Sequence, residues 1–189
     1  MDNLQKSAKA FQKLFDYEYL IVLGKKKKLY SFIIEFRKQD FFHLAGLQYL
    51  KDIPQLKKNR DSVFDEIISG RISEDVLKKS SFYIKAEERI EKISEIEKIL
   101  DNNETVFRFY KNKSSFSQID AEYFLETELD GKTNYIFIDS NEEDKMFCKS
   151  FFFNNTNDYR LNQIHMTLLK KEKIDKIAGE KTILVNKLK

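Results

Sequence analysis

The sequence is poor in the residues that build metal and disulfide sites. It contains a single cysteine, Cys148, and two histidines, His43 and His165. A single cysteine excludes an internal disulfide and a cysteine-rich zinc site, and two histidines leave few ligands for another metal centre. We therefore expect no metal and no cofactor. We interpret Cys148 as a packed strand residue, because no neighbouring residue in the sequence would activate a thiolate.

Glycine and proline are also scarce, with five and one residues in 189. Long irregular loops are therefore not expected. There is no glycine-rich phosphate loop, no HExxH and no CxxC, which disfavours nucleotide-driven and zinc-dependent enzymes. No apolar run approaches the roughly 20 residues that span a bilayer, and the polar N-terminus lacks a secretory apolar core. These absences predict a cytoplasmic protein without a membrane partner.

Charge alone points to no partner. The chain has 34 basic and 31 acidic residues, for a net charge of +3, which is too weak to indicate nucleic-acid binding by itself. Aromatic residues are abundant at 14%. The length suits one well-cored domain or two small ones.

The first part of the chain, residues 1–104, predicts a hairpin plus helices. Apolar residues recur at helical spacing over residues 3–15. Residues 17–24 are typical of a strand buried on both sides and residues 29–36 of its hairpin partner, linked by Gly24 and four lysines. A short helix is expected over residues 40–51, with Asp40 as N-cap. A further helix covers about residues 61–69, with Gly70 just past its end and Ser73 opening the next.

The longest helix is expected over about residues 81–100. Its apolar stripe has spacings of three and four and comprises Phe82, Ala86, Ile90, Ile93, Ile96 and Leu100. Arg89 falls on that stripe, whereas Glu87, Glu91 and Glu95 lie off it.

The second part, residues 105–189, predicts a strand meander and a lysine-rich tail. Strands are expected over 105–110, about 117–128, 133–139, 146–153 and about 162–171. Turns are expected at Asp130-Gly131, Ser140-Asn141 and Asn154-Asn155. The tail carries an apolar patch, Ile183-Leu184-Val185. We predict a single α+β domain over residues 1–189: a curved, mainly antiparallel sheet with an N-terminal helix and a middle helical segment packed on it.

His43 is the first candidate catalytic residue. It lies in an aromatic run, FFHLAGL, between strand-like and helix-like sequence. Histidine can act as a general acid or base near neutral pH. The alternative is a structural histidine whose ring fills a gap at a helix start.

Arg89 is the second candidate. An arginine on an apolar helix stripe is costly unless a carboxylate or an anionic ligand pairs with it. Its planar fork suits a phosphate group. The alternatives are a stem that reaches solvent, or an ion pair with an internal glutamate such as Glu35 or Glu122.

The remaining candidates come from late strands and nearby tyrosines. Ser150 stands in an aromatic strand and shares a face with Phe152, opposite Phe151 and Phe153. Gln163, His165 and Thr167 share a face that is either a substrate surface or a solvated sheet face. Tyr83 and Tyr159 are candidate substrate contacts.

These features together resemble a known family. The FFHLAGL stretch after a hairpin, a middle helix with Arg89, and the late strand Lys149-Ser150-Phe151-Phe152 are similar to the phage-associated nuclease-like domains of the barnase–EndoU–colicin–RelE group. The resemblance covers roughly residues 17–173. Ala45 departs from it, because the family usually has a hydroxyl residue after His-Leu.

The resemblance implies a metal-independent ribonuclease, associated with a phage or mobile element as a toxin or effector. A ribose 2′-hydroxyl would attack the adjacent phosphate and leave a cyclic phosphate and a free 5′-hydroxyl. His43, Arg89 and Ser150 would be catalytic, and Tyr83, Tyr159, His165 and Thr167 would bind substrate. The expected partners are single-stranded or transfer RNA, whose unpaired bases stack on aromatic rings, and a cognate inhibitor protein.

Two other functions fit the same residues. The first is a non-catalytic binding or inhibitor protein, such as a phage accessory or antitoxin-like module with the same fold. The second is an assembly protein that uses an exposed sheet edge. Convergence of His43, Arg89 and Ser150 in one pocket would favour the enzyme.

Overall fold

The computed structural model describes residues 1–114, 116–129, 131–141, 145–153 and 158–188. The chain divides into two compact units. The first comprises Met1–Phe15 and Arg37–Glu97, and the second Asp16–Phe36 and Lys98–Lys189. The predictions of a single domain and of helices packed on the sheet stay predictions.

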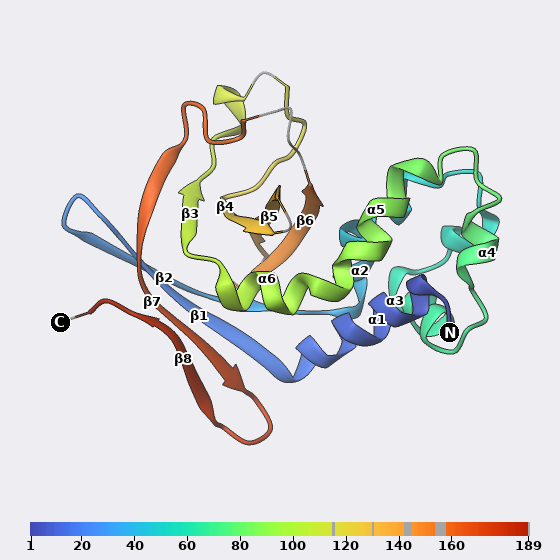
Figure 1. Cartoon of the computed structure of the whole chain (residues 1–189), viewed down its shortest axis with the longest axis horizontal. Helices are drawn as coiled ribbons and strands as arrows, with labels where there is room; N and C mark the ends of the chain where they lie inside the picture. Colours follow the sequence, from blue (N-terminus) through green and yellow to red (C-terminus); the bar gives the residue numbers. More distant parts are fainter. Residues whose placement is uncertain (115, 130, 142–144, 154–157, 189) are drawn as a thin grey trace. The chain divides into compact units, whose positions relative to one another are not determined.

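The first unit is helical. Its helices are α1 (Asn3–Lys13), α2 (Lys38–Leu44), α3 (Arg60–Ile68), α4 (Glu74–Leu77) and α5 (Ile84–Lys92), joined by 3₁₀ turns at Leu47–Tyr49, Pro54–Lys57 and Ile93–Glu95 (Figure 1). The predicted apolar face of the first helix is confirmed, since Leu4, Ala8 and Phe11 are buried. Phe41 lies between Phe11 and Phe64, with ring centroids 5.7 and 5.3 Å away. Three helices therefore meet at one aromatic contact.

The start and end of α2 differ from prediction. The helix begins at Lys38 with Arg37 as N-cap, so the expected N-cap role of Asp40 is wrong. The Asp40 carboxylate instead accepts the Arg37 backbone N–H at 3.0 Å and its guanidinium at 2.9 Å. Burial raises the pKa of Asp40 despite these bonds. The helix ends at Leu44, because Gly46 takes a left-handed conformation that no helix continues through.

The long helix expected over residues 81–100 is interrupted. It consists of α5, the 3₁₀ turn Ile93–Glu95 and α6 (Ile96–Asn102). The predicted apolar stripe is confirmed from Ala86 onward, whereas Phe82 is exposed. The predicted helix boundaries at Gly70 and Ser73 are also confirmed. Gly70 has φ +78° after α3, and Ser73 is the N-cap of α4.

The second unit is a mixed sheet that closes on itself. Its strands are β1 (Tyr17–Lys25), β2 (Lys28–Glu35), β3 (Thr105–Arg108), β4 (Tyr123–Leu129), β5 (Lys132–Ser140), β6 (Met146–Phe153), β7 (Ile164–Asp175) and β8 (Lys181–Asn186) (Figure 1). The order is β1-β2-β6-β5-β4-β3-β7-β8, and β7 also pairs with β1. Seven strands thus form a ring, which we call the closed sheet, with β8 on the outside of β7. The predicted α+β class and mainly antiparallel pairing are confirmed, but closure and the parallel β2–β6 pair were not foreseen.

Each face of the closed sheet has its own packed layer. Inside, Phe32 of β2 meets Tyr123 of β4, a strand that is not its neighbour, at 5.0 Å. Outside, six buried rings form what we call the aromatic cluster: Phe107, Phe109, Phe124, Tyr135, Phe137 and Tyr159. The strands β3, β4 and β5 are therefore covered on both faces.

Several strand bounds also differ from prediction. The strand expected over 117–128 begins only at Tyr123, and β7 continues to Asp175. The tail patch at 183–185 forms β8, which the sequence did not predict. Residues Leu20 and Val22 of β1 are half-buried, so that strand is not buried on both sides. The expected turns at Asp130 and Asn154-Asn155 lie outside the described residues.

A buried lysine closes the C-terminal end of α6. Lys171 of β7 is 1% exposed, and its ammonium group donates to the carbonyls of Leu100, at 2.6 Å, and Asn103. Leu100 lies in the last turn of α6 and Asn103 follows its last residue; backbone acceptors at a helix C-terminus lack helical partners. Burial lowers the pKa of Lys171 to about 8, although Asp101 and Glu104 oppose this.

Candidate active site

The stretch around His43 forms a helix end followed by a tight turn. His43 lies in the last turn of α2 and is half-exposed. Its ring meets the Phe42 ring edge-to-face at 5.8 Å. The Gly46 N–H donates to the His43 carbonyl at 3.2 Å, and Gly46 has φ +74°. The imidazole is therefore carried on a short, hydrogen-bonded turn.

Helix α5 packs closely against this turn at Gly46, where a side chain would be crowded. A Cβ atom on Gly46 would lie 3.0 Å from Cδ of Arg89 and 3.3 Å from Cα of Ala86. The backbone of the turn therefore rests directly on the stem of Arg89. The Ala45-Gly46 pair is the sequence signal for this contact.

The guanidinium of Arg89 is also positioned by an aromatic ring. Its Cζ lies 5.2 Å from the centroid of the Tyr49 ring, a cation–π distance. Arg89 is half-exposed, and its Nη1 atom is shielded from solvent. We call His43, Gly46, Tyr49 and Arg89 the turn cluster. Two of its four residues, His43 and Arg89, were expected, whereas Tyr49 was missed because nothing in its spacing marks it.

The glutamates named as alternative partners for Arg89 have other cations beside them. Glu35 forms an ion pair with Lys145 at 3.0 Å. Glu122 accepts from Arg108 and from the Ser140 hydroxyl, both at 2.5 Å. Burial alone would raise the pKa of Glu122, but these hydrogen bonds lower it below its usual value.

Ser150 belongs to the second unit, so the structure does not test its convergence with the turn cluster. It is half-exposed on β6, opposite Phe137. The register shifts between Phe137 and Ile138, and this bulge leaves Lys149 as the extra residue on β6. Lys149 forms an ion pair with Asp139 at 2.5 Å.

His165 and Ser150 are the two end residues of a row of cross-strand partners that runs over five strands of the closed sheet. The row runs in register as His165, Phe107, Phe124, Phe137 and Ser150. His165 is exposed, and its ring meets Phe107 edge-to-face at 5.2 Å. Thr167 is exposed on the same strand, whereas Met166 and Leu168 are buried. The predicted alternation of β7 is thus confirmed.

The two candidate tyrosines have well-defined neighbours. The Tyr83 hydroxyl donates to Glu74 at 2.8 Å, and burial and that carboxylate raise its pKa. Tyr159 is 7% exposed within the aromatic cluster, and its ring centroid lies 4.9 Å from that of Tyr135. Their roles as substrate contacts stay predictions. Cys148 is buried in β6, as predicted.

Among the described residues, no group of three or more histidine, cysteine, aspartate or glutamate residues is placed to hold a metal ion. None of the helices in that part of the chain has the length and apolar character that a membrane crossing requires.

A known protein family matches the chain over nearly its whole length. The model of the phage-Barnase-EndoU-ColicinE5/D-RelE like nuclease 4 family matches residues 3–188. The chain belongs to this family. The resemblance noted from FFHLAGL, Arg89 and the KSFF strand is therefore confirmed. No curated protein and no solved structure matches the chain. As a member of a phage-associated nuclease-like family, it has nucleic acid as its implied substrate class.

Proposed function

We propose that the chain is a metal-independent ribonuclease that acts as a phage- or mobile-element-associated toxin or effector. In the proposed reaction a ribose 2′-oxygen forms a bond to the adjacent phosphorus while the bond to the 5′-oxygen breaks. The 2′-hydroxyl gives up its proton, and the leaving 5′-oxygen takes one up. The products are a 2′,3′-cyclic phosphate and a 5′-hydroxyl, so no water or metal enters the balance.

The turn cluster is the observation that supports this proposal. His43 is half-exposed on a turn whose glycine touches the stem of Arg89. Imidazole suits proton transfer, which contributes typically ~10²–10⁴ in rate. The guanidinium is held over the Tyr49 ring, and preorganised positive charge of this kind can stabilise the charged phosphate in the transition state.

Ser150 is proposed to donate a hydrogen bond to a non-bridging phosphate oxygen. Its half-exposed position beside a bulge suits such a role, because bulges re-aim side chains near active sites. His165 and Thr167, both exposed on β7, are proposed as substrate contacts, together with Tyr83 and Tyr159. A toxin of this kind also implies a cognate inhibitor protein.

The test is incubation with labelled single-stranded RNA and transfer RNA in excess chelator. We expect the wild-type protein to cleave at least one of them and to leave 2′,3′-cyclic phosphate and 5′-hydroxyl ends. His43→Ala should lower the rate by about 10²-fold or more. Arg89→Lys should also lower it, because lysine lacks the planar fork.

Arg71→Lys is the matched control, since Arg71 is exposed in the same unit. It should cleave like wild type. Failure of the wild-type protein to cleave either RNA would refute the proposal and favour the non-catalytic binding function.

A further inference from the structure

A pocket opens beside the turn cluster, within the first unit. It measures about 310 Å³, which lies within the range of small-ligand sites. It is lined by Phe42, Leu47, Gln48, Leu50, Lys51, Ile53, Leu56 and Lys57. Phe42 immediately precedes His43, and Gln48 immediately precedes Tyr49. One stretch of chain therefore builds both the pocket wall and most of the turn cluster.

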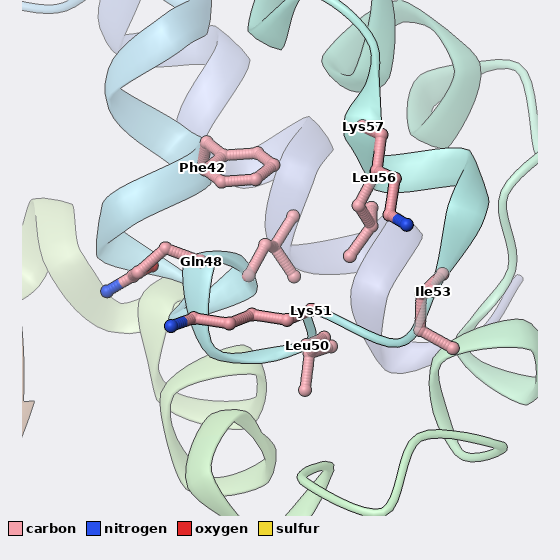
Figure 2. Close-up of a pocket in the computed structure, with 8 residues that line it drawn as sticks. Phe42, Gln48, Leu50, Lys51, Ile53, Leu56 and Lys57 are labelled. Atoms are coloured by element: carbon pink, nitrogen blue, oxygen red, sulfur yellow. The ribbon is translucent and has the colours of Figure 1, made fainter.

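The pocket offers a flat ring and an apolar floor. Leu47, Leu50 and Leu56 are buried, and Phe42 is half-exposed. Figure 2 shows the Phe42 ring on one side of the pocket and the Lys51 side chain extended along the other. Arg60 lies over the Phe42 ring at 5.7 Å, which adds positive charge to this wall. Such a wall favours a flat, polarisable group next to an anion.

The rim is cationic. Lys51 and Lys57 are exposed, and neither forms an ion pair with a carboxylate in the described part of the chain. Residues 48–60 contain four basic residues and one acidic residue. Lys58 is paired with Glu66 at 2.7 Å, so the positive excess of this segment that no carboxylate among the described residues offsets is two charges. The occupant should therefore carry negative charge beside its flat group.

Gln48 supplies a polar group at the same place. Its Oε1 atom is shielded from solvent and has no hydrogen-bond partner among the described residues. Rotation about the terminal bond of a glutamine side chain is soft, so either amide atom can reach a ligand. Figure 2 shows the ends of Gln48 and Lys51 pointing to the same side of the pocket. A hydrogen-bonding edge and a phosphate would thus be met together.

We propose that this pocket binds one unpaired nucleobase of the RNA substrate. The base stacks on Phe42, its edge bonds the Gln48 amide, and Lys51 and Lys57 contact the flanking phosphates. The neighbouring position of His43 makes this the base next to the cleaved bond. The identity of the substrate as RNA rests on the function proposed above, whereas the pocket itself is argued from its own residues.

The experiment measures binding of fluorescein-labelled RNA octamers by anisotropy, in the His43→Ala background so that no cleavage interferes. The probes are octamers of adenylate, cytidylate and uridylate, and an abasic octamer with the same phosphates. The best-bound base-containing octamer should bind about 5- to 150-fold more tightly than the abasic one, as expected for one stacked base. Phe42→Leu and Gln48→Leu should each shrink that ratio and leave abasic binding unchanged.

The lysines are tested by salt dependence. The pair Lys51→Gln and Lys57→Gln should reduce the slope of log K against log salt concentration by about 1.4, which corresponds to about 0.7 for each phosphate contact to a single strand. Phe82→Leu, Gln12→Leu and Lys9→Gln change exposed residues of the same types in the same unit. These controls should bind every probe as the His43→Ala parent does.

Equal binding of base-containing and abasic octamers would overturn the pocket proposal, as would unchanged ratios in both Phe42→Leu and Gln48→Leu. Cleavage by the wild-type protein is measured separately. Cleavage without base-dependent binding removes the pocket and keeps the ribonuclease. Base-dependent binding without cleavage keeps the pocket and removes the ribonuclease.

Discussion

Gly46→Ala provides a direct test of the turn cluster. The residue has φ +74°, where a Cβ atom costs about 1–2 kcal/mol. The added methyl group would also lie 3.3 Å from Cα of Ala86 and 3.0 Å from Cδ of Arg89. The first of these atoms belongs to the backbone of α5 and cannot move alone, so we add about 1–3 kcal/mol for overpacking. The free energy of unfolding should fall by about 2–5 kcal/mol.

Gly179→Ala is the control for the backbone term. Gly179 has φ +72°, and no atom of the described residues lies within 4 Å of its ideal Cβ position. Its free energy of unfolding should fall by only about 1–2 kcal/mol, which is the cost of a Cβ atom in the left-handed conformation. Urea unfolding followed by circular dichroism gives both values. Equal losses in the two variants would show that α5 does not press on the turn, and the reasoning would be refuted.

The same variant should affect catalysis. The methyl group displaces the stem of Arg89, and a misplacement of about 1 Å in a catalytic group can cost about 10²-fold in rate. RNA cleavage by Gly46→Ala should therefore fall far more than cleavage by Gly179→Ala, under conditions where both are folded. Wild-type activity in Gly46→Ala would remove Arg89 from the proposed mechanism.

Three further predictions concern stability, each measured by urea unfolding. The pKa of Lys171 is lowered to about 8 from an unfolded value of 10.5, so the unfolded chain binds more protons between these values and stability rises with pH there. From pH 8 to 9.5 the wild type should gain about 2 kcal/mol relative to Lys171→Met. Phe124→Ala, at a fully buried position in the aromatic cluster, should cost about 3–5 kcal/mol. Tyr83→Phe removes the hydrogen bond to Glu74 and should cost about 1 kcal/mol.

Each of these has a contradicting outcome. Parallel pH profiles for wild type and Lys171→Met would mean that Lys171 titrates as if exposed. A loss below about 1 kcal/mol in Phe124→Ala would mean that the cluster is loosely packed. An unchanged midpoint in Tyr83→Phe would show that the bond to Glu74 contributes nothing to folding.

Local patterns predicted most of the elements in the first half of the chain. Helical spacing found α1 and α3, and Gly70 and Ser73 marked the correct boundaries. The pattern failed where a single residue changes the backbone. Gly46 ends α2 early. The 3₁₀ turn Ile93–Glu95 interrupts the predicted long helix, but buried apolar residues keep their spacing of three and four across it, so the sequence pattern does not mark the interruption.

Closure of the sheet could not be predicted from period-two alternation. Alternation assigns residues to faces, as it did for Met166 and Thr167, but it does not say which strands pair. The β1–β7 pairing joins Tyr17 to Asp175, a long-range contact that no local signal encodes. The strand β8 was missed because its side chains are mostly exposed, so its pattern resembles that of a tail.

Only some residues of the turn cluster could be predicted, because the others come together through the fold. His43 and Arg89 were identified by chemical type and by position on an apolar stripe, and the structure places both at the turn. Tyr49 and the pocket beside it depend on which side chains meet across the turn. That information lies in the conformation of Gly46, which only the fold reveals.

The division of the chain into units sets the order in which it can fold during synthesis. The first unit is complete once Glu97 has emerged, whereas the closed sheet needs Asp175, which pairs with Tyr17. At about 5–20 residues per second, the 78 residues from Lys98 to Asp175 take about 4–16 s to make. During that interval β1 and β2 must wait as a hairpin with open edges, which are prone to wrong pairing. The long-range β1–β7 closure should thus be the slow step of folding, and the helical unit should form first.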